Sequence, residues 1–409
     1  MDRWAVIADD LTGALDTALQ FRKAGLQTMV STRPGIWPSH GSVVALSTES
    51  RHDSAANAAA GVTAAFHTLP CGRSARIYKK TDSLLRGNIG AELRALRDAA
   101  GSEPLVFAPA YPTGGRTTVD GVHLLEGVPV ADADPGRDPV TKVLESHIPS
   151  LLRDSAGLKA EQVPLEIVRG DQDGLVDALT RTRRTSVDVL VPDVETDGDL
   201  RAIASALRSS AAGRISAGSA GLAEYLARPY QASIKSADLG RSVFVAAVVG
   251  TPSAHTKVQV ERALGTGFAR RMRIRSGADI EAAIRETRFN RRSERLIIFD
   301  TTIEGTAPPP EERRRHLRCV GELCRAIADA ADQPGLILTG GDTARAALDA
   351  LEVDAIEVLG EIEWGVPGGH ALRGTRRVAS VVTKGGTMGG PDALTTAFRR
   401  LCSTVSQAA

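Results

Sequence analysis

The apolar run from Trp4 to Ala8 ends in two adjacent carboxylates, Asp9 and Asp10, and a helix, Ala14–Lys23, is predicted after them. Carboxylates accept hydrogen bonds from hydroxyl groups, and the free N–H groups at a helix start favour an anionic group. Either acid could instead simply cap the helix. Because open α/β sheets bind ligands at the carboxyl ends of their strands, two acids in succession at this place favour a ligand site.

Short apolar runs alternate with helical stretches along the chain, which predicts mostly parallel sheets flanked by helices. A length of 409 residues exceeds the roughly 100–200 residues of one typical domain. A polar segment without a clear period, Pro229–Arg241, is predicted to contain a linker. The sequence therefore predicts an α/β protein with one α/β domain at residues 1–230, a linker at 231–241 and a second α/β domain at 242–409.

Both halves contain predicted strands. In the first half, a polar loop rich in Gly and Thr, Pro109–Asp120, is predicted to precede a hairpin at Val122–Val130. The strands predicted in the second half are Val243–Val249, Met272–Ile274, Leu296–Phe299, Leu336–Leu338, Ala355–Val358 and Val378–Thr383.

Charge and cysteine content narrow the classes of partner. Lys and Arg number 50 against 49 Asp and Glu, so no bulk field favours nucleic acid or a membrane surface. No apolar run approaches the roughly 20 residues of a membrane span, and no signal peptide is expected ahead of the first predicted strand. The four cysteines lack metal-ligand spacing and suit a reducing cytosol. We expect a cytoplasmic protein without nucleic-acid or membrane partners, and a homodimer is compatible with the sequence.

Three predicted strand ends in the second half are rich in glycine and hydroxyl groups: Val249–Thr256, Thr339–Thr343 and Thr383–Gly390. Glycines let backbone N–H groups approach phosphate closely, hydroxyls add donors, and Lys384 could supply a cation. Each loop alone could be ordinary turn chemistry, but three on one sheet favour a site for nucleotide phosphates. The chain lacks the Gly-x4-Gly-Lys-Ser/Thr loop of P-loop proteins. No Gly-x-Gly-x-x-Gly follows the first strand, which weakens a dinucleotide interpretation.

The first half offers charged groups at strand-to-helix junctions instead. Arg86 could hold a carboxylate through two hydrogen bonds. Aspartates could accept from hydroxyls, and Asp82 or Asp10 could act as a general base. These residues suit a small hydroxylated acid; the set comprises Asp9, Asp10, Lys80, Asp82, Ser83, Arg86 and Asn88.

Several of these groups also have a structural interpretation. Lys79 and Lys80 could lie on a solvated surface, and Arg86 could form an ion pair with Asp82. Arg313 to Arg315 are expected on a solvated helix face. A structural role is expected for three isolated histidines, His123, His147 and His255.

Residues 7–17, 79–90 and 339–343 resemble the four-carbon acid sugar kinases, a family long labelled only as a domain of unknown function. The similarity continues through residues 107–112, 146–147 and 216–221, in the same order, and covers essentially the whole chain. The resemblance implies an N-terminal acid-sugar-binding domain, a C-terminal nucleotide-binding domain and an active site in the cleft between them. Members phosphorylate the terminal hydroxyl of D-threonate, D-erythronate or 3-oxo-tetronates with ATP.

The resemblance also implies roles for individual residues. The implied substrate-binding residues are Asp9, Asp10, Lys80, Asp82, Ser83, Arg86 and Gly87. The implied ATP-binding residues are Ser253, Gly340, Gly341, Asp342, Thr343, Lys384 and a glycine of the last loop, Gly386 or Gly389. That loop commonly reads Lys-Ser-Gly-Asn-Phe-Gly, and this chain lacks its aromatic residue. Leu11 stands where Phe is common, and the loop Ala131–Asp138 also diverges, so the exact substrate stays open.

The sequence thus predicts an ATP-dependent kinase for the 4-hydroxyl of a four-carbon sugar acid, D-threonate or D-erythronate. Mg²⁺ should bridge the phosphates of ATP, and its protein ligands are not assigned. The alternatives are a 3-oxo-tetronate 4-kinase, a non-catalytic sensor of a sugar acid or nucleotide, and a dehydrogenase that binds NAD.

Overall fold

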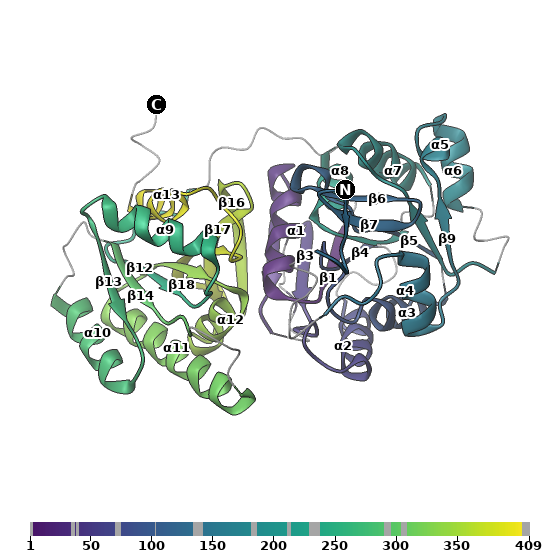
Figure 1. The fold of residues 1–409 in the computed structure, drawn as a ribbon. Helices are drawn as coiled ribbons and strands as arrows, with labels where there is room; N and C mark the ends of the chain where they lie inside the picture. The colour runs from purple at the N-terminus through teal and green to yellow at the C-terminus, as the bar shows by residue number, and fades with distance from the viewer. Residues whose placement is uncertain are drawn as a thin grey trace. The chain divides into compact units, whose positions relative to one another are not determined.

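The computed structural model describes residues 3–33, 37, 41–69, 75–102, 104–133, 142–180, 186–210, 214–228, 238–289, 296–303 and 309–402. The chain divides into two compact units, Met1–Ser233 and Ile234–Ala409, each a sheet covered by helices (Figure 1). The predicted α/β class is therefore confirmed. Most of the predicted linker, 231–237, lies outside the described residues, and the domain limits and the interdomain cleft stay predictions.

The sheet of the N-terminal unit consists of parallel strands. In spatial order they are β2 (Thr28–Ser31), β3 (Val43–Ser47), β1 (Trp4–Ala8), β4 (Arg76–Lys80), β11 (Ile215–Gly218), β5 (Leu105–Ala108), β10 (Val189–Pro192) and β9 (Ala160–Val163). Strands that are covered on both faces are buried along their whole length, which explains runs such as Trp4-Ala5-Val6-Ile7-Ala8.

Helices cover both faces of this sheet (Figure 1). One group comprises α1 (Leu11–Lys23), α7 (Asp197–Ser209) and α8 (Ala220–Ala227), with α5 (Leu165–Val168) and α6 (Gln172–Thr180) packed beside α7. The other group comprises α2 (Ala55–His67), α3 (Ile89–Ala99) and α4 (Ile148–Ala156). A core of apolar side chains that includes Ile7, Ile77, Leu93 and Phe107 fills the space between the sheet and the second group.

A small antiparallel sheet lies in the segment that follows β5. It consists of β6 (Arg116–Val119), β7 (Val122–Leu125) and β8 (Val128–Pro129). The hairpin predicted at Val122–Val130 is confirmed, but the prediction of an unbroken loop at Pro109–Asp120 is wrong because its end forms β6. The polar sequence Arg-Thr-Thr-Val concealed this strand, since most of it is only partly buried.

The C-terminal unit has a mixed sheet. In spatial order its strands are β13 (Ala269–Arg273), β14 (Leu296–Asp300), β12 (Val245–Val249), β15 (Gly335–Thr339), β18 (Arg376–Lys384), β17 (Val366–Arg373) and β16 (Ala355–Glu363). The strands from β13 to β18 run parallel to one another, and β17 pairs antiparallel with both β18 and β16. Helices α9 (Ala254–Gly265) and α13 (Ala393–Cys402) lie on one face, and α10 (Gly277–Phe289), α11 (Pro310–Ala330) and α12 (Gly341–Ala350) on the other (Figure 1).

Two predictions for this sheet are wrong in detail. The first strand after α9 begins at Ala269 rather than Met272, because its arginines, two of them exposed and one partly buried, break the apolar pattern. Strand β17 was not predicted, because its Pro-Gly-Gly sequence is typical of a turn. Gly369 is needed there, since a Cβ atom would lie 2.1 Å from the carbonyl oxygen of Glu357 on the paired strand.

Helix α1 begins at Leu11, three residues before the predicted start. Asp10 is its N-cap and accepts a hydrogen bond from the backbone N–H of Gly13 at 2.8 Å, so the capping alternative is confirmed for Asp10. None of the helices in the described part of the chain combines the length and apolar character that crossing a bilayer requires.

Candidate active site

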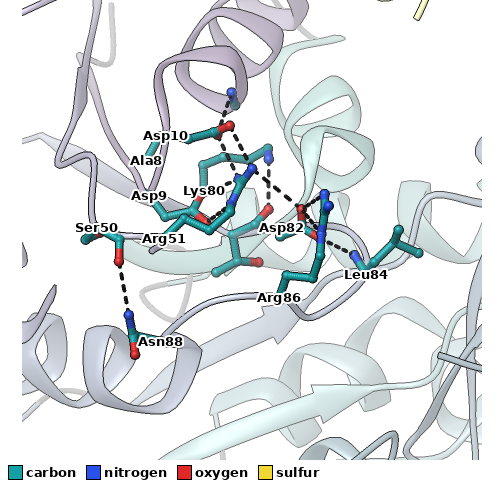
Figure 2. A network of polar contacts seen from close by, with 12 residues as sticks. Ala8, Asp9, Asp10, Ser50, Arg51, Lys80, Asp82, Leu84, Arg86 and Asn88 are labelled. Carbon is teal, nitrogen blue, oxygen red and sulfur yellow. Dashed lines mark hydrogen bonds and ion pairs between the residues drawn. The ribbon is translucent and has the colours of Figure 1, made fainter. Parts of the chain in front are cut away.

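Three adjacent strands of the N-terminal unit, β3, β1 and β4, deliver charged side chains to the same edge of the sheet (Figure 2). Asp9 and Asp10 follow β1, Arg51 lies in the segment after β3, and Asp82 follows β4. Because the carboxyl ends of parallel strands share one edge, residues far apart in the chain meet there. The sequence analysis anticipated the acids but missed Arg51, whose only signal was its place shortly after a strand.

Arg51 is the centre of this cluster (Figure 2). Its Nε atom lies 2.7 Å from Asp9 Oδ2, and its Nη1 atom lies 2.7 Å from Asp10 Oδ2. Its Nη2 atom donates to the second oxygen of Asp10 at 2.7 Å and of Asp9 at 3.0 Å. Burial by itself raises the pKa of Asp9, but the neighbouring Arg51 outweighs that effect and keeps the pKa below its usual value. One guanidinium thus fixes both carboxylates in place.

Asp82 links Arg51 to the helix-initiating segment after β4. It accepts from Arg86 Nη2 at 2.6 Å and from the backbone N–H of Leu84 at 2.8 Å, and Arg51 Nη1 lies 3.7 Å away. Burial raises the pKa of Asp82, but Arg51 and Arg86 together hold it far below its usual range. The ion-pair alternative for Arg86 is therefore confirmed. Whether Arg86 also binds a ligand carboxylate stays a prediction.

Two glycines allow close approach within the cluster. A Cβ atom on Gly13 would lie 2.5 Å from Asp10 Oδ1 and 3.0 Å from Lys80 Nζ. Gly87 has a φ of +93°, and its Cβ atom would lie 3.3 Å from Arg51 Cγ. The motif glycines at 13 and 87 are therefore required for packing, whatever else they do.

The expectation that Lys79 and Lys80 could lie on a solvated surface is wrong, because both are buried. Adjacent residues of a strand point to opposite faces of the sheet. Lys79 accordingly forms an ion pair of 3.1 Å with Glu92 of α3, whereas Lys80 approaches the start of α1. Lys80 Nζ donates to the carbonyl oxygen of Thr81 at 2.8 Å, which leaves two of its three N–H donors for other partners.

Neighbouring residues hold the charged segments in position. Asn88 Nδ2 donates to the carbonyl oxygens of Ser50 at 3.0 Å and Asp53 at 2.9 Å, and so fixes the segment that carries Arg51. The predicted structural role of His123 fits its surroundings. Its Nε2 atom lies 2.9 Å from the carbonyl oxygen of Ser83, and burial lowers its pKa to about 4. His123 is therefore neutral at pH 7.

The predicted nucleotide loops follow β12, β15 and β18, which are neighbours in the sheet of the C-terminal unit. The hydroxyls of Ser253 and Thr256 both donate to the carbonyl oxygen of Gly386 at 2.9 Å. Lys384 Nζ donates to the carbonyl oxygen of Gly385 at 3.0 Å and to Thr256 at 3.3 Å. The first and last of the three loops are thus bound to each other.

The middle loop packs equally closely against the first. Gly340 has a φ of +103°, which residues with a side chain rarely adopt, and α12 starts directly after it. A Cβ atom on Gly250 would lie 2.0 Å from the buried Thr343 Oγ1. Asp342, by contrast, is half-exposed and pairs with Arg313 of α11, so Arg313 is not purely a solvated residue.

The two glycines left open by the sequence analysis differ in position. A Cβ atom on Gly386 would lie 2.8 Å from Thr251 Oγ1, within the loop cluster. One on Gly389 would lie 2.7 Å from Ala393 Cβ, at the start of α13. His255 and Gln259 hold the segment around Gly389 through their contacts with its carbonyl oxygen, at 2.7 Å and 3.3 Å. Gly386 therefore lies against Thr251 and Ser253, whereas Gly389 lies beside the start of α13.

Two family models match the two halves of the chain. A family model described as a sugar-binding N-terminal domain matches residues 4–226, and one described as a nucleotide-binding C-terminal domain matches residues 246–394. The chain is 32% identical to the D-threonate kinase of Bordetella bronchiseptica over 95% of both sequences. The chain belongs to the four-carbon acid sugar kinases. The chain is also 33% identical to the D-threonate kinase of Cupriavidus necator, over 97% of the chain and 98% of the relative. A solved structure from Salmonella typhimurium, 23% identical, has a TM-score of 0.82 over 98% of both chains, so the fold is shared.

Proposed function

We propose that the protein transfers the γ-phosphoryl group of ATP to the 4-hydroxyl of a four-carbon sugar acid. The observation that carries this proposal is the cluster of Arg51 with Asp9, Asp10 and Asp82 on three adjacent strand ends. Relatives named D-erythronate kinase and 3-oxo-tetronate kinase are 26% identical to the chain, less than the D-threonate kinases. D-Threonate is therefore the first acceptor to test.

The cluster would bind the hydroxyl groups of the acceptor. Asp9, Asp10 and Asp82 are hydrogen-bond acceptors, and Lys80 retains donors. Because its pKa is so low, Asp82 is a weak base that stays ionised and holds Arg86. Asp10 is more accessible, with 21% of its side chain exposed, and would accept the proton of the 4-hydroxyl. Phosphoryl transfer depends more on positioning and charge than on proton removal, so either acid contributes modestly as a base.

The three loops of the C-terminal unit would bind ATP. Backbone N–H groups at the start of α12, after Gly340, suit the phosphates, and Ser253, Thr343, Lys384 and Gly386 would surround them. Within the described residues, no group of three or more His, Cys, Asp or Glu side chains is arranged to hold a metal ion. Mg²⁺ would be held mainly by phosphate oxygens and water, with one or two carboxylates at most, and would neutralise charge on the transferred group.

Lys384 makes the proposed ATP site sensitive to pH. The side chain is 2% exposed, and burial lowers its pKa to about 8. The ammonium form attracts phosphate and the neutral amine does not. We therefore expect the affinity for ADP to fall between about pH 7 and about pH 9. Calorimetric titrations at both pH values should show this fall in the parent and a weak, pH-independent affinity in Lys384→Gln; an equal pH dependence in both proteins would contradict the role of Lys384.

Turnover separates the proposed kinase from its alternatives. The protein is incubated with ATP and Mg²⁺ and a panel of D-threonate, D-erythronate and 3-oxo-tetronates, and ADP release is followed. We expect release that depends on the acid, and is fastest with D-threonate. Fastest release with a 3-oxo acid would instead support a 3-oxo-tetronate kinase. Tight binding of ADP without turnover of any acid would support a sensor.

A further inference from the structure

The charged cluster of the N-terminal unit is internally balanced. Three carboxylates, Asp9, Asp10 and Asp82, face three cations, Arg51, Arg86 and Lys80. A tetronate would add one more negative charge to this largely buried place. A buried charge is tolerated only where it is paired and hydrogen-bonded. Binding of the acid therefore calls for a further cation, from outside the motifs that the sequence analysis singled out.

Arg116 of β6 lies on the correct face to supply it. Residues two apart on a strand point to the same side, so Arg116 shares a face of β6 with Thr118. The hydroxyl of Thr118 lies 3.0 Å from His123 Nδ1, and His123 Nε2 lies 2.9 Å from the carbonyl oxygen of Ser83. That face of the small sheet is thus directed at the segment that carries Asp82 and Arg86.

Within the described part of the chain, the interactions of Arg116 leave its positive charge without a fixed partner. Its Nη1 atom donates to the carbonyl oxygen of Gly114, and its Nε atom is buried without a hydrogen bond among the described residues. The same residues provide no ion pair for it. Asp82 and Glu126 are the carboxylates whose charges act on it, but Asp82 is already bound to two arginines and Glu126 is exposed. Burial lowers the pKa of Arg116, with Arg86 acting in the same direction.

The backbone also holds Arg116 in place. Its N–H and carbonyl groups exchange hydrogen bonds with Tyr111, at 3.0 Å and 2.8 Å. A Cβ atom on Gly114 would lie 2.9 Å from Arg116 Nη1, so the guanidinium lies directly over the turn. A fixed guanidinium with unused donors is suited to a carboxylate, which it can bind through two parallel hydrogen bonds.

We propose that Arg116 binds the carboxylate of the acceptor and makes the enzyme specific for sugar acids over uncharged polyols. This inference rests on the proposed function, because it concerns the same acceptor site. It predicts that Arg116 discriminates by charge. Removal of its charge should weaken the binding of a sugar acid and leave the binding of a polyol of the same length unaffected.

Arg116→Gln is compared with the parent and with Arg94→Gln. Arg94 is a matched control, because its guanidinium, like that of Arg116, donates to a backbone carbonyl. The donor is Nε and the acceptor is the carbonyl oxygen of Ala156 at 2.6 Å, away from the cluster. D-Threonate binding is measured by calorimetry without nucleotide, and kcat/KM is measured for D-threonate and for threitol. We expect Arg116→Gln to weaken D-threonate binding and raise its KM by about 100-fold. The weak activity on threitol should change less than about threefold. Arg116→Lys keeps the charge but not the planar guanidinium, so its affinity for D-threonate should lie between those of the parent and Arg116→Gln.

Unchanged affinity for D-threonate in Arg116→Gln would overturn the inference, even if kcat falls, because the arginine would then act on the transferred phosphoryl group. Equal losses with D-threonate and threitol would also overturn it, since they would indicate a structural role. In both cases the parent still phosphorylates D-threonate, so the proposed function survives. A parent that binds no tetronate at all overturns the proposed function together with this inference.

Discussion

Arg51→Ala is expected to abolish D-threonate binding and to destabilise the N-terminal unit by about 3–5 kcal/mol. The side chain of Arg51 is 12% exposed, and it joins Asp9, Asp10 and Asp82. Without it, three neighbouring carboxylates repel one another in a place with little water. The pKa values of Asp9 and Asp82, which Arg51 lowers, would rise, and the acceptors for the sugar hydroxyls would lose their fixed positions. Urea unfolding followed by circular dichroism measures the stability, and calorimetry measures the binding.

A matched variant separates stability from binding. Arg97 also forms a partly buried ion pair in this unit, with Asp188 at 2.6 Å, away from the cluster. Arg97→Ala should lose stability but keep its affinity for D-threonate. Arg51→Lys should recover part of the stability, because it restores one charge, but little of the binding, because a lysine cannot contact both oxygens of two carboxylates. Normal D-threonate binding by Arg51→Ala would mean that the acceptor site lies elsewhere.

Gly340→Val is expected to weaken ADP binding by about 10- to 100-fold and to leave D-threonate binding unchanged. The φ of +103° at Gly340 is unfavourable for a residue with a branched side chain. The loop would have to move, and with it the backbone N–H groups that begin α12. Because the loop belongs to the C-terminal unit, the acceptor cluster should not respond.

Gly374→Val is the control for this substitution. Gly374 also has a positive φ, +58°, and it lies in the turn between β17 and β18, at the opposite end of β18 from Lys384. Its φ lies in the left-handed region, so valine should be strained there too, although less than at position 340, and the variant should bind ADP like the parent. Both affinities are measured by calorimetry. If Gly340→Val binds ADP normally, or if both variants lose affinity equally, the loop after β15 is not the phosphate site.

The parts of the fold that were predictable from the sequence are those with a local signal. The β1 strand, its two terminal acids and the glycine-rich strand ends could be recognised because each lies within a short continuous stretch. Strand β17 could not, because its Gly-Gly pair is required by the close approach of β16, which only the paired structure reveals.

The candidate site shows the same limit more sharply. Arg51 has no motif around it, and it becomes part of the cluster only because β3 pairs with β1, so that the segments after these two strands meet. Strand order is a tertiary property that local patterns do not encode. Arg116 was missed for a related reason: its segment has the composition of a loop, and the β6–β7 pairing is what orients it. Lys79 and Lys80 were misjudged because charged residues are usually exposed, whereas here each face of β4 is covered by a helix.

Phosphorus–proton correlation NMR of the reaction mixture tests the central claim most directly. The protein is incubated with ATP, Mg²⁺ and D-threonate, with Arg51→Ala and Gly340→Val as controls. We predict a new phosphomonoester whose phosphorus couples to the two protons on C4, formed in equal amount with ADP, and slowed or lost in the two variants. ADP formation without a phosphorylated acid, or a phosphate attached to another carbon, would contradict the proposed transfer to the 4-hydroxyl.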